Sequence, residues 1–308
     1  EKYMSRPQRL RRCQLSVPGS SEKMMTKSAG LECDHVFLDL EDAVAPNAKE
    51  EARGLIVDAL NRHDWTPKTL CVRINDVETE YCHDDIVEVV TGAGDKLDTI
   101  MLTKAKNTHD VMFVHLLLDQ LEKKLKLKNR IGIECLIEEV EGMMNVEEIA
   151  ACSDRLECLI FGMGDYSASQ AMNIETIGGD SSSYPPDVWH YPRYKLTIAC
   201  RANGIDPVDG PFANFRDADT FRTECERGNV LGMVGKWAIH PSQIDLGNEV
   251  NSPSEKEIAQ AHRILEAMEQ AQKDGQGAVS LDGRLIDIAS IKQADVMVRK
   301  AAQIAAAG

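Results

Sequence analysis

Ionisable side chains recur in this sequence at the ends of short apolar runs, at intervals of about one strand plus one helix. Two of them, Glu138 and Asp165, are carboxylates that end successive runs. Mg²⁺ typically takes one or two protein carboxylates and completes its octahedron with water and substrate oxygens. The pair therefore suggests a divalent-cation site, with a salt bridge to a nearby Lys or Arg as the alternative. The run-ending residues are Asp39, Glu41, Asp42, Arg73, Lys104, Glu138, Asp165, Asp209 and His240.

Other members of this set suggest further roles. Arg73 could stabilise negative charge that develops on an oxygen, or it could form an ion pair with Glu41 or Asp42, and both can hold at once. A lone histidine such as His240 is more often a hydrogen-bonded structural residue than a general base. Asp165 follows the sequence FGMG, whose glycines, Gly164 among them, either let the backbone approach a ligand or serve tight packing.

The elements that must position these residues form a repeating pattern. The apolar runs are nearly continuous, as in strands buried on both faces, and amphipathic helical stretches lie between them. Eight such units predict an α/β fold, a TIM (β/α)₈ barrel, with an open doubly wound sheet as the alternative. In a barrel the run-ending residues converge on the carboxyl-terminal mouth. The eight runs are residues 14–19, 35–42, 69–75, 99–104, 131–138, 156–165, 204–210 and 233–241.

The 308 residues exceed what a barrel alone needs. After the eighth run we expect a helix over 254–273, a Gly-rich break, a turn at 281–283 and a last amphipathic helix over about 286–305. The sequence thus predicts a barrel domain over 1–250 and a C-terminal helical extension over 251–308. A loop rich in Gly, Ser, Pro and aromatic residues is expected over 177–192, including Trp189.

Composition excludes some classes of partner. The formal net charge is −15, from 50 Asp and Glu against 35 Lys and Arg, which argues against nucleic acid as the main partner. No apolar run approaches the roughly 18 residues of a membrane helix, and no apolar segment follows the basic N-terminal residues as in a secretory signal. The nine cysteines include no C-x-x-C pair and are interpreted as buried small hydrophobes of a cytoplasmic protein.

Several motifs together resemble one family. They include LDLEDAVAP, VRIND, CLIEE, FGMGDY, GKWAIHPSQ and GRLIDIASIKQA. In this order they are similar to the acyl-CoA lyases of the HpcH/HpaI aldolase and citrate lyase β-subunit superfamily, above all to those acting on malyl-CoA and β-methylmalyl-CoA. The resemblance covers about residues 11 to 305. The chain departs from the family in a shorter loop at 177–192 and in Ser16, where some members carry a larger side chain.

The resemblance implies a TIM barrel that uses Mg²⁺ or Mn²⁺ for reversible Claisen chemistry on CoA thioesters. Malyl-CoA would give acetyl-CoA and glyoxylate, and β-methylmalyl-CoA would give propionyl-CoA and glyoxylate. Citramalyl-CoA, which would give acetyl-CoA and pyruvate, is a further candidate substrate. A malyl-CoA thioesterase on the same scaffold is the alternative enzyme, and a non-catalytic scaffold is a third hypothesis.

The resemblance also implies roles for individual residues. Glu138 and Asp165 would bind the metal, and Arg73 would face the enolate, with Glu41 as a further catalytic candidate. Asp287 would be an acid/base donated across the subunit interface of a hexamer built as a dimer of trimers, whose C-terminal extension covers a neighbouring site. We expect the net charge to lie on the outer helices, and Arg12, Lys27, Arg73 and Lys104 to form a basic patch at the mouth. The residues expected to contact substrate or CoA are Ser16, Ser21, Lys27, Arg73, Gly164, Asp165, Ile239 and His240.

Overall fold

The computed structural model describes residues 6–181 and 184–307. The chain divides into two compact units, with the division between Asn251 and Ser252. The first unit is an α/β barrel and the second is a helical hairpin.

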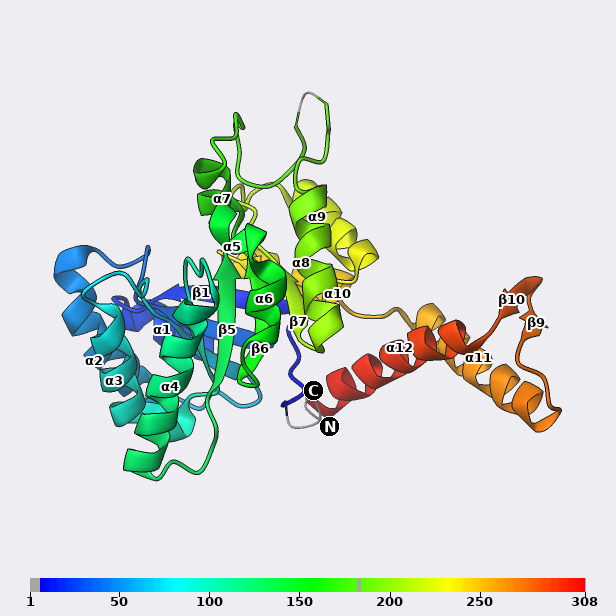
Figure 1. Ribbon diagram of the computed structural model, residues 1–308, viewed down its shortest axis with the longest axis horizontal. Helices are drawn as coiled ribbons and strands as arrows, with labels where there is room; N and C mark the ends of the chain where they lie inside the picture. The colour runs from blue at the N-terminus through cyan, green and yellow to red at the C-terminus, as the bar shows by residue number, and fades with distance from the viewer. Residues whose placement is uncertain (1–5, 182–183, 308) are drawn as a thin grey trace. The chain divides into compact units, whose positions relative to one another are not determined.

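The first unit is built around a barrel of parallel strands (Figure 1). The strands pair in chain order, and β8 pairs with β1 to close the barrel. The eight predicted runs each contain one strand, so the barrel is confirmed and the open-sheet alternative is wrong. Because all eight strands are parallel, their carboxyl ends meet at one mouth. The strands are β1 Cys13–Pro18, β2 His35–Asp39, β3 Thr69–Arg73, β4 Thr99–Leu102, β5 Gly132–Ile137, β6 Leu156–Phe161, β7 Asp206–Asp209 and β8 Gly235–Ala238.

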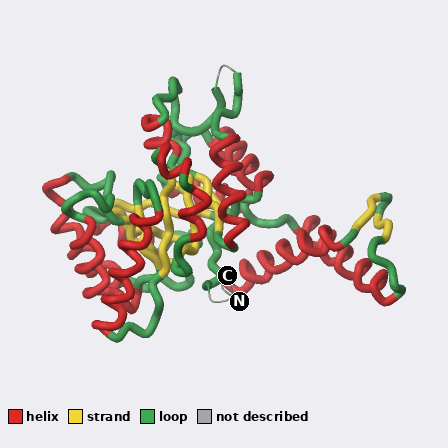
Figure 2. The backbone as a smooth tube through the Cα atoms, in the orientation of Figure 1, coloured by secondary structure: helices red, strands yellow, loops and turns green. Residues whose placement is uncertain are grey.

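Helices surround these strands in the first unit (Figure 2). Local sequence explains where several begin and end: Asn107 and Asp110 form a capping box at the start of α4, and Gly232, at φ 97°, ends α9. The α-helices are α1 Glu22–Ala29, α2 Lys49–Arg62, α3 Cys82–Ala93, α4 Thr108–Leu125, α5 Val140–Met144, α6 Val146–Ala151, α7 Met163–Ser169, α8 His190–Asn203, α9 Ala218–Leu231 and α10 Ile244–Val250. Short 3₁₀ segments are η1 Pro46–Ala48, η2 Gly94–Lys96 and η3 Pro241–Gln243.

The predicted loop over 177–192 is largely confirmed, although α8 already begins at His190 and residues 182–183 lie outside the described residues. Trp189 is buried, donates from Nε1 to the Gly179 carbonyl at 3.2 Å and packs edge-on against Phe161. This tryptophan therefore fixes the end of the loop to the barrel wall.

The barrel interior has charged ends and an apolar middle. Side chains two residues apart on a strand share a face, and along β2 this places His35, Phe37 and Asp39 at successive levels. The same alternation along β5 gives Glu134, Leu136 and Glu138. The middle level, here called the apolar layer, consists of Phe37, Cys71, Met101, Leu136, Cys158, Ile160, Val208 and Trp237.

Below the apolar layer, Glu134 is the centre of a fully buried polar network. Its Oε1 accepts from Arg11 Nη1 at 2.6 Å and from Thr99 Oγ1 at 2.9 Å, and it lies 2.9 Å from His35 Nε2. Burial alone would raise the pKa of Glu134, but Arg11 and His35 outweigh it and hold that pKa well below its usual range. Since Glu134 lies inside an apolar run, the sequence pattern did not reveal this network.

The cysteines are packed as the sequence predicts. All nine are free thiols, and eight of them are buried. Burial raises the pKa of Cys71 and Cys135 well above the ordinary value, so these thiols stay neutral and behave as small apolar side chains.

In the second unit two helices pack against each other, α11 Glu255–Lys273 and α12 Ile288–Ala307. Ser254 and Glu257 form a capping box that starts α11. The two helices and the turn are confirmed, but the sequence missed the strands flanking the turn, β9 Val279–Leu281 and β10 Arg284–Ile286. Asp282 and Gly283 both have positive φ, as a two-residue hairpin turn requires.

A search for membrane-spanning helices among residues 6–181 and 184–307 finds none with the necessary length and hydropathy.

Candidate active site

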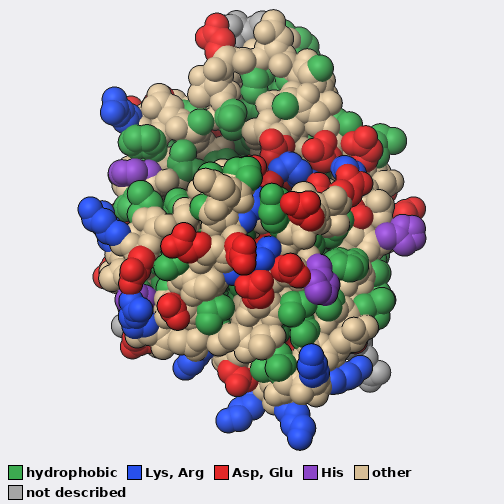
Figure 3. Space-filling view, turned by 90° about the vertical axis from the view of Figure 1, so that its left-hand side faces the viewer, with side chains coloured by type: hydrophobic (Ala, Val, Ile, Leu, Met, Phe, Trp, Pro, Cys, Tyr) green, Lys and Arg blue, Asp and Glu red, His purple; other side chains and the backbone are tan. Residues whose placement is uncertain are grey.

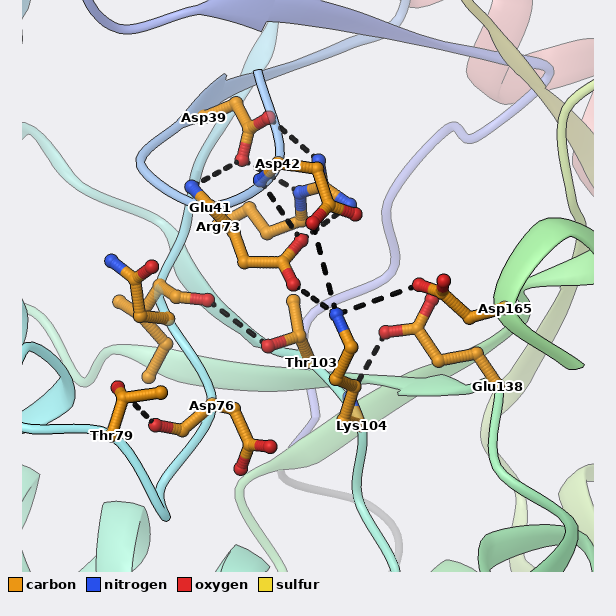
Figure 4. A network of polar contacts seen from close by, with 12 residues as sticks. Asp39, Glu41, Asp42, Arg73, Asp76, Thr79, Thr103, Lys104, Glu138 and Asp165 are labelled. Atoms are coloured by element: carbon orange, nitrogen blue, oxygen red, sulfur yellow. Dashed lines mark hydrogen bonds and ion pairs between the residues drawn. The ribbon is translucent and has the colours of Figure 1, made fainter. Parts of the chain in front are cut away.

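Seven run-ending side chains meet at the mouth of the barrel (Figure 4). They follow five neighbouring strands, β2 to β6, and form one network of ion pairs and hydrogen bonds. The structure thus brings together seven of the nine run-ending residues that the barrel pattern placed at the mouth. The mouth cluster, as we call it, consists of Asp39, Glu41, Asp42, Arg73, Lys104, Glu138 and Asp165.

Arg73 is held by two carboxylates. Its Nε and Nη2 donate to the two oxygens of Asp39 at 2.7 and 2.6 Å, and its Nη1 lies 3.2 Å from Glu41 Oε2. The guanidinium carbon lies 5.2 Å from the Trp237 ring centre and 5.8 Å from that of Phe37. Burial alone would lower the pKa of Arg73, but Asp39 and Glu41 raise it overall, so the guanidinium stays charged.

The ion pair between Arg73 and Glu41 confirms the structural alternative for Arg73, and Asp39 is a stronger partner that the sequence reading missed. The sequence does carry a signal for this partner, because Asp39 and Arg73 both end their strands. The structure pairs these two positions on the adjacent strands β2 and β3.

Glu138 is almost fully buried at the base of the mouth cluster, at 3% exposure. Its Oε1 accepts from the Lys104 backbone N–H at 3.0 Å. Burial raises the pKa of Glu138 well above its usual range, and Glu41 and Asp165 add to that rise against the opposing effect of Arg73 and Lys104. The surroundings of Glu138 therefore disfavour its charged form, mainly because the side chain is buried.

Gly162 gives Glu138 its space. A Cβ at Gly162 would lie 2.6 Å from both the Cβ and the Oε2 of Glu138, closer than real Cβ atoms approach. Gly162 directly precedes α7, whose first turn carries Asp165. One glycine thus lets the two proposed metal ligands approach each other from consecutive units of the barrel.

Lys104 is the local cation for Asp165. Its Nζ lies 3.5 Å from Asp165 Oδ2 and 3.8 Å from Asp42 Oδ1, and it contacts Glu41 Oε1 directly. The salt-bridge alternative therefore holds for Asp165. Lys104 has a positive φ of 50°, which is uncommon for a residue other than Gly, Asn or Asp.

Carboxylates outnumber cations in the mouth cluster, at five against two. Oxygen donors with an excess of negative charge are the ligands that Mg²⁺ and Mn²⁺ prefer. Glu138 and Asp165 come from adjacent units and both lie in this excess, so the residues present fit a divalent cation.

The prediction of a basic patch at the mouth is wrong in the residues that it groups together. Arg73 and Lys104 are present but are neutralised by acidic neighbours, and Arg12 lies at the opposite end of the barrel, where it binds Asp34 at 2.7 Å. Figure 3 shows a face of the protein on which Asp and Glu side chains gather around a few Lys and Arg side chains. The carboxylates of the mouth cluster show that acidic groups lie at the mouth, so the negative charge is not confined to the outer helices.

Ile239 and His240 follow β8 at the same end of the barrel. The Ile239 N–H donates to Gln243 Oε1 at 2.9 Å, and its side chain is partly exposed. His240 Nδ1 accepts from the Ser242 N–H at 3.1 Å and its ring stacks on Phe215. His240 thus caps η3, which is the structural role considered for it.

The remaining substrate candidates lie outside the ion-pair network. Ser16 is partly exposed on β1, and Ser21 caps α1 by accepting from the Met24 N–H at 3.3 Å. Lys27 is exposed in the last turn of α1. Gly164 precedes Asp165 in α7 and is partly exposed.

Asp209, although it ends β7, does not join the mouth cluster. Its carboxylate is bound by Arg193 at 2.9 and 3.0 Å and by Lys236, and Glu224 completes this buried network. The pattern at the strand ends could not reveal this, because Arg193 lies on helix α8.

Asp287 belongs to the second unit. Its side chain is exposed, and its Oδ1 accepts from the backbone N–H groups of Ala289 and Ser290 at 2.9 and 3.3 Å, so it caps α12. Asp287 and the mouth cluster therefore belong to different units of the chain.

The chain is similar to several known proteins. The L-malyl-CoA/β-methylmalyl-CoA lyase of Cereibacter sphaeroides is 45% identical over 97% of this chain and 97% of its own length. The (3S)-malyl-CoA thioesterase of the same species is 35% identical over 96% of this chain and 95% of its own. Protein CitE from Mycobacterium tuberculosis, in complex with magnesium, acetoacetate and coenzyme A, has a TM-score of 0.72 and 26% identity, covering 94% and 97% of the two chains.

The family model for HpcH/HpaI aldolase/citrate lyase matches residues 12–241. This range includes all eight strands of the barrel and all of the mouth cluster. With this match and its full-length relatives, the chain belongs to the HpcH/HpaI aldolase/citrate lyase family.

Proposed function

We propose that this chain is a magnesium-dependent acyl-CoA lyase. It cleaves malyl-CoA to acetyl-CoA and glyoxylate and β-methylmalyl-CoA to propionyl-CoA and glyoxylate, and it catalyses the reverse condensations. The observation that carries the proposal is the mouth cluster, in which Glu41 and Lys104 link Arg73 to the two carboxylates Glu138 and Asp165 in one network. The relative with this activity in its name, 45% identical over almost the whole chain, supports it.

Glu138 and Asp165 are the proposed ligands of Mg²⁺ or Mn²⁺. When bound there, the ion supplies Lewis-acid polarisation of the carbonyl of the oxo-acid. The magnesium in the related CitE structure supports this assignment. Asp165 is the more accessible of the two carboxylates, with a side chain 41% exposed, and Glu138 forms the buried side of the site.

Arg73 would offset negative charge on the thioester oxygen as the enolate forms. Asp39 fixes the guanidinium plane through two hydrogen bonds, and Glu41 contacts both Arg73 and Lys104. We therefore propose that Glu41 acts in the site by holding these two cations in place.

Asp287 would take the proton from the acyl-CoA carbon in condensation and return it in cleavage. Proton transfer by one carboxylate contributes about 10²–10⁴-fold to a rate. Stabilisation of the enolate by Arg73 must then provide much of the remaining acceleration.

The C-terminal extension, residues 252–308, is the proposed lid over the site of a neighbouring subunit, in a hexamer made of two trimers. Within its own unit it leaves large apolar side chains exposed, including Leu285 at 76%, Ile288 at 65% and Val296 at 53%. Apolar surface of this kind marks contact with another protein surface, and closure of the lid would exclude water. The hydrogen bonds that cap α12 use Oδ1 of Asp287 and not Oδ2.

Ser16, Ser21, Lys27, Gly164, Ile239 and His240 are proposed to contact the CoA thioester or the oxo-acid. Among them only Lys27 brings a positive charge that is suited to a CoA phosphate. We further expect a cytoplasmic enzyme, in keeping with its free cysteines.

A malyl-CoA thioesterase is the second candidate, supported by the relative that is 35% identical. The two reactions give different products. The test is incubation with malyl-CoA, β-methylmalyl-CoA and citramalyl-CoA, before and after chelation and return of Mg²⁺, with identification of all products. We expect glyoxylate with intact acetyl-CoA or propionyl-CoA, lost on chelation, and no activity in Glu138→Gln prepared in parallel. Free CoA together with malate would show the thioesterase instead.

A further inference from the structure

Lys104 occupies a particular place in the mouth cluster that none of the roles above explains. Its ammonium contacts Glu41 and lies within 4 Å of Asp42 and Asp165. Its backbone N–H donates to Glu138. One residue thus touches both proposed metal ligands, with its side chain on Asp165 and its main chain on Glu138 (Figure 4).

The ammonium and a divalent cation would compete for Asp165. Mg²⁺ sits 2.0–2.1 Å from its ligands, and the ammonium is 3.5 Å from Asp165 Oδ2. A metal ion on that oxygen would therefore lie within about 6 Å of the ammonium in its present position. Two cations this close repel strongly where water is scarce, and the Lys104 side chain is only 22% exposed.

We propose that Lys104 is the internal counter-cation of the mouth cluster: its ammonium neutralises the carboxylates in the absence of metal and leaves Asp165 when a divalent cation binds. Its backbone N–H holds Glu138 in both states. The side chain thus lowers metal affinity and stabilises the metal-free protein, while the main chain positions a ligand. This inference rests on the metal site of the proposed function.

The two parts of this role can be separated by substitution. Lys104→Met keeps the backbone N–H and the length of the side chain but removes the charge, whereas Lys104→Arg keeps the charge. Lys106→Met is the matched control, because it removes one positive charge two positions away from a pair with Glu78 outside the mouth cluster.

The experiment measures Mn²⁺ binding to the full chain after chelation, from the electron paramagnetic resonance of free Mn²⁺ at fixed pH and ionic strength. We expect Lys104→Met to bind Mn²⁺ about tenfold more tightly than the wild type, with Lys104→Arg and Lys106→Met within about twofold of it. Without metal, Lys104→Met should have a lower Tm than Lys106→Met, and Mn²⁺ should raise its Tm by more.

Unchanged or weaker Mn²⁺ binding by Lys104→Met would overturn the proposal. A rise in KM with unchanged Mn²⁺ affinity would do the same, because it would assign Lys104 to substrate. If the wild type itself binds no Mn²⁺, the metal site of the proposed function fails as well, and that outcome is visible before any variant is compared. Lys104→Gln provides the same comparison if Lys104→Met does not fold.

Discussion

The position of Glu138 depends on a residue with no side chain. Gly162 leaves room for the carboxylate, and the Lys104 N–H fixes one of its oxygens. Its other oxygen, Oε2, is one of the atoms that a Cβ at Gly162 would crowd. A change at Gly162 should therefore affect metal binding and the reaction before it affects the fold.

We predict that Gly162→Ala lowers kcat/KM by at least about 100-fold, because a displacement of about 1 Å in a reacting site costs that much. Mn²⁺ affinity should fall in parallel, while the far-ultraviolet circular dichroism stays that of the wild type. Gly54→Ala is the control: it lies in helix α2, where an added Cβ meets no atom within 4 Å. It should keep full activity and gain about 1 kcal/mol of stability. Full activity in Gly162→Ala would contradict the described packing.

Residue type and place at a strand end were enough to predict that Arg73, Glu138 and Asp165 lie together. They were not enough to predict which side chains form ion pairs and hydrogen bonds with these three residues. Asp39 and Lys104 act through side chains that reach across from adjacent strands, and the direction of that reach depends on packing. Asp209 has the same sequence signature, yet a cation from α8 binds it elsewhere.

Strands β1 to β8 each carry an alternation that the sequence shows only in part. The runs read as continuously apolar because outward residues pack under the helices and the middle inward residues form the apolar layer. Glu134 interrupts its run, and its partner Arg11 precedes β1. Strands β9 and β10 have three residues each, which is too short for an alternation to be detected.

The network below the apolar layer makes a testable contribution to stability. Glu134→Gln leaves the buried Arg11 without its main counter-charge and should cost about 3 kcal/mol at pH 7, measured by urea unfolding. Because the pKa of Glu134 is lowered in the folded protein, its contribution is present in full above its ordinary pKa of 4.5 and declines as the pH falls below that value. The difference between wild type and variant should therefore shrink between pH 6 and pH 3.5.

Asp154→Asn serves as the control, since its pair with Arg130 is solvent-exposed and such pairs contribute about 0–1 kcal/mol. A difference between wild type and Glu134→Gln that stays constant down to pH 3.5 would contradict the assigned pKa direction.

The chain divides after Asn251, so the mouth cluster belongs to the first compact unit and Asp287 to the second. The sequence of one chain shows which helices form the second unit, but contacts between subunits leave no periodic pattern in it. The lid, the hexamer and the role of Asp287 therefore stay predictions, and they can be tested together.

We predict that Asp287→Asn and Glu138→Gln are each inactive but restore activity when co-expressed. If each site takes Glu138 from one subunit and Asp287 from another, random assembly leaves about a quarter of the sites with both residues intact. The measurement is lyase activity per mass of mixed protein, with light scattering for the assembly state. Each variant expressed alone is the control. No recovery in assemblies shown to be mixed would place both residues of a site on one chain.

The apolar layer closes the barrel beneath Arg73, whose guanidinium lies against the Phe37 and Trp237 rings. A reactant can therefore reach the mouth cluster from the mouth side but not through the barrel. Of two reactants that bind at this mouth, the one that lies closer to the apolar layer has to enter first and leave last. For the proposed condensation, glyoxylate would bind beside the metal site of Glu138 and Asp165 before the acyl-CoA, so steady-state kinetics should show compulsory-order binding with the thioester second.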